Sequence, residues 1–328
     1  MMMADYLMGH ETVFIDTGNK AFGEEVSKPK AGKRDPRGQY ELTTSAHEES
    51  QDADIIMAHT AMPLEWLGKD IPIVWVLHGR PLACFRHERL HPKSNAYSIL
   101  TAIAGWDRVK YLVTFWPSHA EYWKAFVPES KMVVLDSPPV DTDRFSKEGD
   151  VHTFEKPGKI NIVLADAFRE DVDLFEIAHG AIAFARKNKD VKFHFYGLNR
   201  DDKVFGYVLQ ALSNVGGLGD VVGRVRHIET AYRAADIVLS PHVTTTRIIG
   251  EALCCGTPVI AAKGNLHATR TATMSDPNSI EQSISTLCKD IRDSSDWVKE
   301  RVKSAAGQFS LSRYGQNMIQ LYRKGKKG

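Results

Sequence analysis

The sequence predicts an α/β protein built from parallel sheets in two domains. Short apolar segments recur along the chain, and many are apolar throughout, which suits strands buried on both faces of a sheet. Segments with the helical spacing of apolar residues lie between several of them, and strands that alternate with helices form parallel sheets. A chain of 328 residues is long enough for two domains of about 150 residues each.

The individual elements follow from these segments. We expect strands over residues 12–16, 53–59, 72–78, 111–116, 132–136, 160–165, 191–197, 236–240 and 258–262. The clearest helix is expected over residues 172–188, and a last helix over residues 310–328 begins at a serine cap and ends in a basic tail. The apolar faces of these two helices are formed by Leu174, Phe175, Ala178, Ile182 and Ala185, and by Met318, Ile319 and Tyr322.

The domain boundary is expected within residues 146–159, which are polar, contain glycine and proline, and separate two strand-rich parts of the chain. The predicted domains are therefore residues 1–150 and residues 151–307, followed by the terminal segment 308–328.

The composition is that of an ordinary globular protein, with 43% hydrophobic and 25% charged residues. A formal net charge of +1 gives no general attraction to nucleic acid or acidic membranes, although a local basic face remains compatible with it. Cys84, Cys254, Cys255 and Cys288 lack the paired spacing of metal ligands, which predicts buried, reduced thiols. Because we find neither a signal peptide nor a membrane-spanning segment, we expect a cytoplasmic protein.

The stretch TTTRIIGEALCCGTPVIAA, residues 244–262, is a candidate ligand site. It follows an expected strand and leads into an expected helix, so the free backbone N–H groups at its start suit an anion. Arg247 adds a positive charge, and Glu251 lies one helical turn later, where the two can form an ion pair or contact a ligand jointly. Alternatively, Thr244, Thr245 and Thr246 only cap the helix, and Arg247 with Glu251 is a structural pair.

A wider set of motifs resembles the GT-B glycosyltransferases, especially glycosyltransferase family 4. The segments AYRAADIVLSP and GEALCCGTPVIAA match, in order, the donor-binding half of that family. The similarity covers roughly residues 50–325, and the combination is far more specific than any one motif. Further matching segments are KINIVLADAFREDVDLFEIAHGAIAFA, VKFHFYG and SPPVDTDRF.

This resemblance implies two Rossmann-like domains that face a cleft. The domain of residues 151–307 would hold a nucleotide sugar, UDP- or GDP-linked, and the segment 308–328 would form a helix that packs back toward the first domain. The implied activity is transfer of a hexosyl or pentosyl group with retention of configuration, without a metal ion or other cofactor.

The resemblance also implies roles for individual residues. Glu251 matches the glutamate that hydrogen-bonds the ribose hydroxyls, and Thr245 and Thr246 would face the diphosphate or the sugar. The residues expected near the base are Tyr196, Gly197, His227 and Ile228.

His78 ends the segment VWVLH, which resembles the family strand whose histidine meets the donor sugar. Its neutral imidazole or its backbone carbonyl would orient the sugar and stabilise developing positive charge, while cations and amides stabilise the leaving diphosphate. The structural alternative is a histidine at a strand end with no ligand role.

The sequence departs from the family pattern in three places. Val243 stands where the family commonly has a second glutamate, so recognition of the donor sugar should differ there. The family's Arg and Lys pair is absent, and Arg169 with Arg247 would take over the phosphate charge. DYLMGHETVFID resembles the first helix end and second strand of the family. The first strand and its glycine loop would then be replaced by residues 17–23, or would lie upstream or on another polypeptide.

Other hypotheses remain open from the sequence. The segment HERLH, residues 87–91, satisfies a zinc protease pattern, but charged neighbours and Pro92 favour a solvated loop or helix end. Val243 and the missing first strand suit a binding protein for a nucleotide sugar or a partner, without turnover.

The acceptor is the least defined part of the prediction. We expect a saccharide, a lipid-linked or a small-molecule acceptor. Basic and aromatic residues over 78–116, and the resemblance to compact phage or viral enzymes, keep a modified DNA base as an option.

Overall fold

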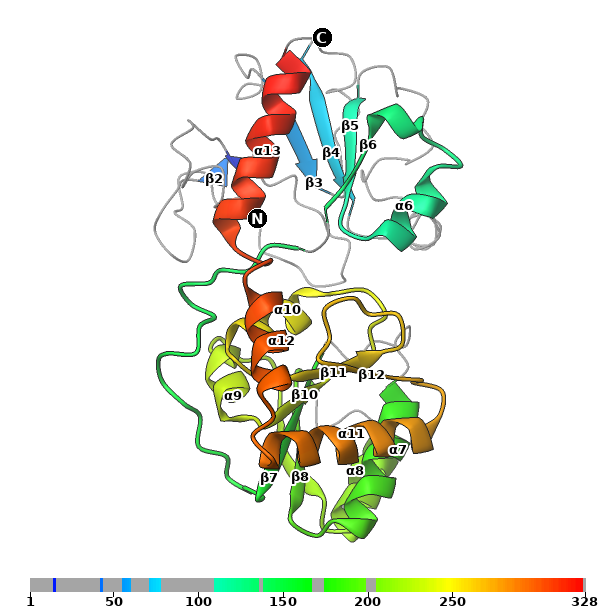
Figure 1. Ribbon diagram of the computed structural model, residues 1–328, viewed down its shortest axis with the longest axis vertical. Helices are drawn as coiled ribbons and strands as arrows, with labels where there is room; N and C mark the ends of the chain where they lie inside the picture. The colour runs from blue at the N-terminus through cyan, green and yellow to red at the C-terminus, as the bar shows by residue number, and fades with distance from the viewer. Residues whose placement is uncertain are drawn as a thin grey trace. The chain divides into compact units, whose positions relative to one another are not determined.

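The structure is a computed structural model, and it describes residues 14–15, 42–43, 55–59, 71–77, 109–135, 138–166, 174–198 and 205–326. The chain divides into two compact units, Met1–Asp136 with Ser312–Gly328, and Ser137–Leu311. Each unit is α/β with parallel strand pairing, which confirms the predicted fold class (Figure 1). The predicted sites at His78 and Arg169, and segments 17–23 and 87–91, lie outside the described residues.

The first unit contains a small parallel pair of strands and a four-stranded parallel sheet. In the pair, β1 (Phe14–Ile15) lies beside β2 (Leu42–Thr43). The larger sheet has the order β3-β4-β5-β6, with β3 Ile56–His59, β4 Ile73–Leu77, β5 Val109–Thr114 and β6 Met132–Val134. Its described helices are α6 (Pro117–Trp123), the 3₁₀ turn η2 (Glu129–Lys131) and α13 (Leu311–Lys326).

Helix α13, although last in the chain, belongs to this first unit. Tyr322 Oη donates a hydrogen bond to Met57 Sδ of β3 at 3.6 Å. The ring of Tyr314 lies 6.4 Å from that of Phe115, which follows β5. These contacts fasten the end of the chain to the four-stranded sheet.

The second unit is a six-stranded parallel sheet with the order β12-β11-β10-β7-β8-β9. Its strands are β7 Ile160–Ala165, β8 Val191–Tyr196, β9 Leu218–Val222, β10 Ile237–Leu239, β11 Val259–Ala262 and β12 Arg270–Ala272. The chain moves outward from β7 to β9, then returns to the other side of β7 with β10. Strand order therefore reverses between β7 and β10, the place where open α/β sheets bind ligands.

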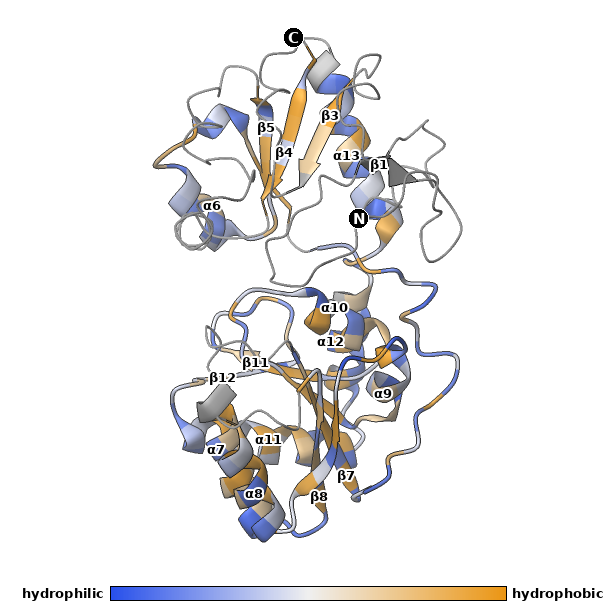
Figure 2. Ribbon diagram, turned by 180° about the vertical axis from the view of Figure 1, so that it is seen from behind, coloured by the Kyte–Doolittle hydropathy of each residue, from blue (hydrophilic) through white to orange (hydrophobic). Residues whose placement is uncertain are grey.

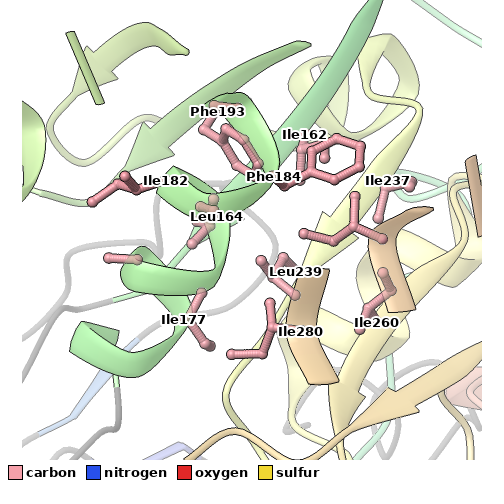
Figure 3. Packing of buried hydrophobic residues seen from close by; sticks show 14 of the residues in the cluster. Ile162, Leu164, Ile177, Ile182, Phe184, Phe193, Ile237, Leu239, Ile260 and Ile280 are labelled. Carbon is pink, nitrogen blue, oxygen red and sulfur yellow. The ribbon is translucent and has the colours of Figure 1, made fainter. Parts of the chain in front are cut away.

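Helices cover both faces of this sheet. The helices are α7 Leu174–Lys187, α8 Gly206–Asn214, α9 Ile228–Ala234, α10 Arg247–Cys254, α11 Pro277–Arg292 and α12 Asp296–Ala306. One core, drawn in Figure 3, joins the sheet to α7, α8 and α11, and the other joins it to α9, α10 and part of α12.

Alternate residues of one strand enter different cores, which explains why the strands are apolar throughout. In β7, Ile162 and Leu164 pack in the core with α7, whereas Val163 packs in the core with α10. Both faces are thus buried, and Figure 2 shows β7 and β8 as largely hydrophobic ribbons.

Residues 138–150 belong to the second unit, so the division between units falls at Asp136 and Ser137, upstream of the boundary expected from composition. The physical reason is Arg233 of α9, whose guanidinium donates to the carbonyl oxygens of Ser146, Asp150 and Arg144 at 2.7, 2.9 and 2.8 Å. A polar segment is thereby attached to the domain that follows it.

Two expectations from composition can be compared with the described residues. Cys254, Cys255 and Cys288 are buried free thiols, as predicted, whereas Cys84 lies outside the described residues. Burial raises the pKa of the Cys288 thiol to about 11. In the described part of the chain, no helix combines the length and the apolar character needed to cross a membrane.

Candidate functional site

The candidate site lies at the carboxyl edge of the second sheet, where strand order reverses. Asp166 follows β7 directly, and residues 240–246 connect β10 to α10. Because all six strands are parallel, the ends of β8 and β9 open onto the same edge. The predicted residues from Tyr196 to Glu251 are thus distributed along one edge of one sheet.

A histidine and a carboxylate bridge the point of reversal. His242 Nε2 lies 2.7 Å from Asp166 Oδ2, so the ring donates to the carboxylate. The Asp166 side chain is 7% exposed and that of His242 is 19% exposed. The sequence pattern does not predict this pair, because its members are 76 residues apart and become neighbours only through the adjacency of β7 and β10.

Thr246 is the N-cap residue of α10, but its side chain does not cap the helix. Its hydroxyl oxygen is buried and has no hydrogen-bond partner within the described structure. The first backbone N–H groups of a helix also lack partners within the helix. The start of α10 therefore presents several hydrogen-bonding groups that a ligand could satisfy.

Thr245 lies in the connection between β10 and α10. Its side chain is buried, and Oγ1 lies 2.8 Å from His267 Nδ1 and 3.3 Å from Asn265 Oδ1. The hydroxyl thus joins the loop after β10 to the loop after β11. Its contacts are those of a residue that holds these loops together.

Asn265 and His267 complete this loop connection. Asn265 Oδ1 accepts the backbone N–H groups of His267 and Ala268 at 3.0 and 2.9 Å, and its amide donates to the His242 carbonyl at 3.3 Å. His267 Nε2 lies 2.8 Å from Gln308 Oε1. The backbone that carries His242 is therefore braced from the neighbouring loop.

Glu251 is half-buried in α10, and its side-chain carboxylate makes no hydrogen bond or ion pair with any residue that the structure describes. Burial raises the pKa of its carboxyl group, and the positive charges of Arg247 and Arg144 oppose that effect. Arg247 is exposed at the start of the helix and does not form the close ion pair that the spacing allowed. The Glu251 carboxylate is consequently available to a ligand.

Tyr196 and Gly197 end β8, on the far side of β7 from β10. The Tyr196 side chain is buried, its hydroxyl has no hydrogen-bond partner among described residues, and burial raises its pKa well above the ordinary value. Gly197 has a φ of +94°, and a Cβ there would lie 2.0 Å from the carbonyl oxygen of Asp166. Close approach of two strand ends explains this glycine.

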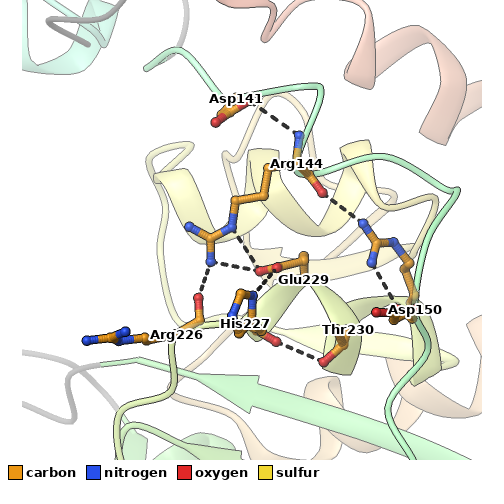
Figure 4. A network of polar contacts seen from close by, with 8 residues as sticks. Asp141, Arg144, Asp150, Arg226, His227, Glu229 and Thr230 are labelled. Carbon is orange, nitrogen blue, oxygen red and sulfur yellow. Dashed lines mark hydrogen bonds and ion pairs between the residues drawn. The ribbon is translucent and has the colours of Figure 1, made fainter. Parts of the chain in front are cut away.

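His227 and Ile228 lie at the start of α9, beside an ion-pair network shown in Figure 4. Arg144 Nε and Nη2 donate to Glu229 Oε2 at 3.0 and 2.8 Å, and Nη2 also donates to the carbonyl of Arg226. The exposed ring of His227 places Nδ1 3.0 Å from Glu229 Oε1.

This network acts on Glu229, which is 6% exposed. Burial pushes the pKa of the Glu229 carboxyl group upward, but the hydrogen bonds from Arg144 and His227 lower it below the ordinary value. The sequence pattern does not predict the pair of Arg144 and Glu229, since 85 residues separate them. Within the described ranges, no group of three or more His, Cys, Asp or Glu residues could hold a metal ion.

Comparison with known proteins agrees with this fold. Residues 162–290 match the family model described as glycosyl transferases group 1. No curated protein sequence matches the chain.

The solved structures of similar fold share little sequence identity with this chain. A glycosyltransferase from Rickettsia africae is 16% identical, with 100% of this chain and 94% of that chain covered and a TM-score of 0.66. Anabaena HepE, solved with UDP and glucose, is 16% identical, with 83% and 78% covered and a TM-score of 0.60. The α,α-trehalose 6-phosphate synthase of Burkholderia multivorans is 10% identical, with 83% and 72% covered and a TM-score of 0.61.

Proposed function

We propose that this chain is a glycosyltransferase that moves a sugar from a nucleotide sugar to an acceptor. The observation that carries the proposal is the coincidence of two findings in the second unit. Residues 162–290 match the family model of group 1 glycosyl transferases. The same residues form the point of strand reversal, and the helix that follows it, α10, carries Glu251, whose carboxylate has no partner among the described residues.

The donor would lie along the carboxyl edge of this sheet. In the proposal, Glu251 binds the ribose hydroxyls, while the first amides of α10, the Thr246 hydroxyl and Arg247 bind the diphosphate. Arg169 would add a second positive charge. The base would lie toward Tyr196, Gly197, His227 and Ile228, and Thr245 would support the loop through its bond to His267.

The nucleotide is proposed to be UDP or GDP. The structure of Anabaena HepE with UDP and glucose supports a UDP-linked sugar as the first donor to test. We further propose transfer of a hexosyl or pentosyl group with retention, without a metal ion or cofactor, and with His78 orienting the sugar. Saccharides, lipid-linked sugars and small molecules are the proposed acceptors, followed by modified DNA bases.

A thermal-shift experiment with UDP- and GDP-sugars tests the donor site. A ligand that binds only the folded protein stabilises it by RT ln(1 + [L]/Kd), about 2.7 kcal/mol at one hundred times Kd. We expect a Tm rise of several degrees for the wild type and a clearly smaller rise for Glu251→Gln. Without ligand, Glu251→Gln should melt at or above the wild-type temperature, because its neutral amide avoids the burial cost of the carboxylate.

The Tm without ligand reports folding of the variant, and the Tm shift with ligand reports its binding, so the two losses can be told apart. No shift of the wild type with any nucleotide or nucleotide sugar would contradict the proposed donor site. A full shift of Glu251→Gln would contradict the role of Glu251 alone.

A second candidate function rests on Val243, which is 54% exposed at the position of the expected second carboxylate. This side chain cannot hydrogen-bond a sugar, which suits a protein that binds nucleotide sugars without turning them over. Tight binding of a donor without hydrolysis or transfer would favour this candidate, whereas donor hydrolysis that Glu251→Gln abolishes would exclude it.

A further inference from the structure

The pair of His242 and Asp166 lies at the carboxyl ends of β10 and β7, the neighbouring strands of the second sheet between which the strand order reverses. The strand that follows β7 in the chain, β8, and the strand that follows β10, β11, lie on opposite sides of this pair of strands, and ligands of open α/β sheets bind at such a reversal. The 2.7 Å hydrogen bond between Nε2 and Oδ2 spans this division. A ligand at the reversal point would therefore meet this pair.

The backbones of both residues are fixed from outside the pair. The Asp166 N–H donates to the Tyr196 carbonyl at 3.1 Å, and Gly197 lies closely against the Asp166 carbonyl. On the other side, the Asn265 amide donates to the His242 carbonyl at 3.3 Å. The imidazole is thus held in place before any ligand binds, which limits the entropy lost on binding.

The hydrogen bond to Asp166 also decides which ring nitrogen remains for a ligand. Nε2 carries the proton that Asp166 accepts, and Nδ1 has no hydrogen-bond partner among the described residues. A protonated imidazole donates from both nitrogens. It can therefore serve the carboxylate and an oxyanion at once, with the positive charge between two negative groups.

We infer that His242, held by Asp166, binds the diphosphate of the nucleotide through Nδ1. The inference rests on the proposed function and specifies how that site recognises its anion. In this inference two side chains bind the phosphates. One is His242, at the point of strand reversal, and the other is the exposed Arg247 at the start of α10. Asp166 is then a positioning residue, because it acts on the ligand through the ring of His242.

The test compares a nucleoside diphosphate with its own nucleoside, UDP with uridine and GDP with guanosine. Affinities are measured by calorimetry, with displacement titrations for the weaker nucleosides. We expect His242→Gln to weaken diphosphate binding about tenfold, as for loss of a charge-assisted hydrogen bond, and to leave nucleoside binding unchanged. Asp166→Asn should show the same selectivity with a smaller loss.

Matched variants control for general damage to the unit. His179→Gln replaces an exposed histidine of α7, and Asp190→Asn removes the carboxylate of an exposed ion pair with Lys159. Both should bind diphosphate and nucleoside as the wild type does. Glu251→Gln should weaken both ligands alike, because they share the ribose.

The outcomes distinguish the inference from the function on which it rests. If the wild type binds neither diphosphate, the donor site itself is wrong, and the inference fails with it. If the wild type binds a diphosphate but His242→Gln binds it equally well, only the inference is overturned. Equal losses for diphosphate and nucleoside in folded His242→Gln would also overturn it, since they would indicate a structural role.

Discussion

Tyr196 carries a hydroxyl group that is buried and without a hydrogen-bond partner in the described part of the protein. Burying a polar group without a partner costs free energy, whereas its replacement by an apolar group of similar shape is nearly neutral or stabilising. A group that lowers stability in the free protein can gain its partner from a ligand. The unpartnered hydroxyl of Tyr196 is therefore a candidate ligand contact, although the side chain is buried.

Tyr196→Phe is expected to unfold at the same or a higher urea concentration, with a gain of up to about 1 kcal/mol. If the hydroxyl contacts the base or ribose, the same variant should bind UDP several-fold more weakly. Urea unfolding and calorimetric titration of one preparation give both quantities. A loss of stability without any change in UDP affinity would show that the hydroxyl serves the folded protein instead.

Helices α7 and α11 approach each other closely enough to require a glycine. A Cβ on Gly180 of α7 would lie 2.6 Å from both Cβ and Cγ2 of Ile280 of α11. These atoms belong to a buried β-branched side chain, which has little freedom to move away. The spacing of this helix pair is thus set by a residue whose helix propensity is poor.

Gly180→Ala should lower the free energy of unfolding by about 1 to 3 kcal/mol, because overlap with Ile280 outweighs the better helix propensity of alanine. Gly206→Ala is the matched control, since a Cβ at the start of α8 meets nothing within 4 Å. The control should be neutral or stabilised by up to about 1 kcal/mol. Equal effects of the two substitutions in urea unfolding would contradict the close contact.

Elements with both faces buried were predictable from the sequence. β7 occupies residues 160–165 as predicted, and β8, β10 and β11 lie within the expected ranges, because continuous apolar segments mark them. β9 was missed, since Gly219 lies against the ring of His194 and Asp220 is buried with its carboxylate on backbone amides. Such a strand lacks an apolar pattern.

The same contrast applies to the candidate site. Thr246, Arg247 and Glu251 lie within one short motif, so their proximity follows from local helix geometry. The pair of His242 and Asp166 depends on strand order, which the sequence pattern left undetermined. Roles for His78 and Arg169 remain predictions, because both lie outside the described residues.

At the scale of the whole molecule, the chain passes from the first unit to the second at Asp136 and Ser137 and returns after Leu311. Two arginines link residues 138–150, which follow Ser137, to α9 of the second unit. Arg144 on the segment binds Glu229 of α9, and Arg233 of α9 binds three carbonyl groups of the segment. These polar contacts thus add to the packing of Val140 and Phe145, the residues through which the same segment enters the core of the second unit.

Arg144→Ala should lower stability at pH 7 by about 2 kcal/mol, because it leaves the buried Glu229 carboxylate without its cation. The lowered pKa of Glu229 stabilises the wild type above the ordinary glutamate pKa, and this contribution is lost as pH falls through the folded-state pKa. The difference between variant and wild type should therefore shrink in acid.

Urea unfolding at pH 7 and in acid measures this difference. Lys159→Ala, which breaks the exposed ion pair with Asp190, should leave stability close to that of the wild type and serves as the control. An undiminished effect of Arg144→Ala in acid would mean that packing, and not the charge of Glu229, determines its contribution.

The first unit is made of two separate parts of the chain, and this has a consequence during protein synthesis. The second unit is one continuous stretch of chain, whereas the first needs α13, made after it. A nascent chain on the ribosome could thus complete its middle portion while the earlier strands still lack their final helix. The first unit, whose strands are synthesised first, would be completed last, because Tyr322 of α13 reaches Met57 of β3 only after the second unit has been made.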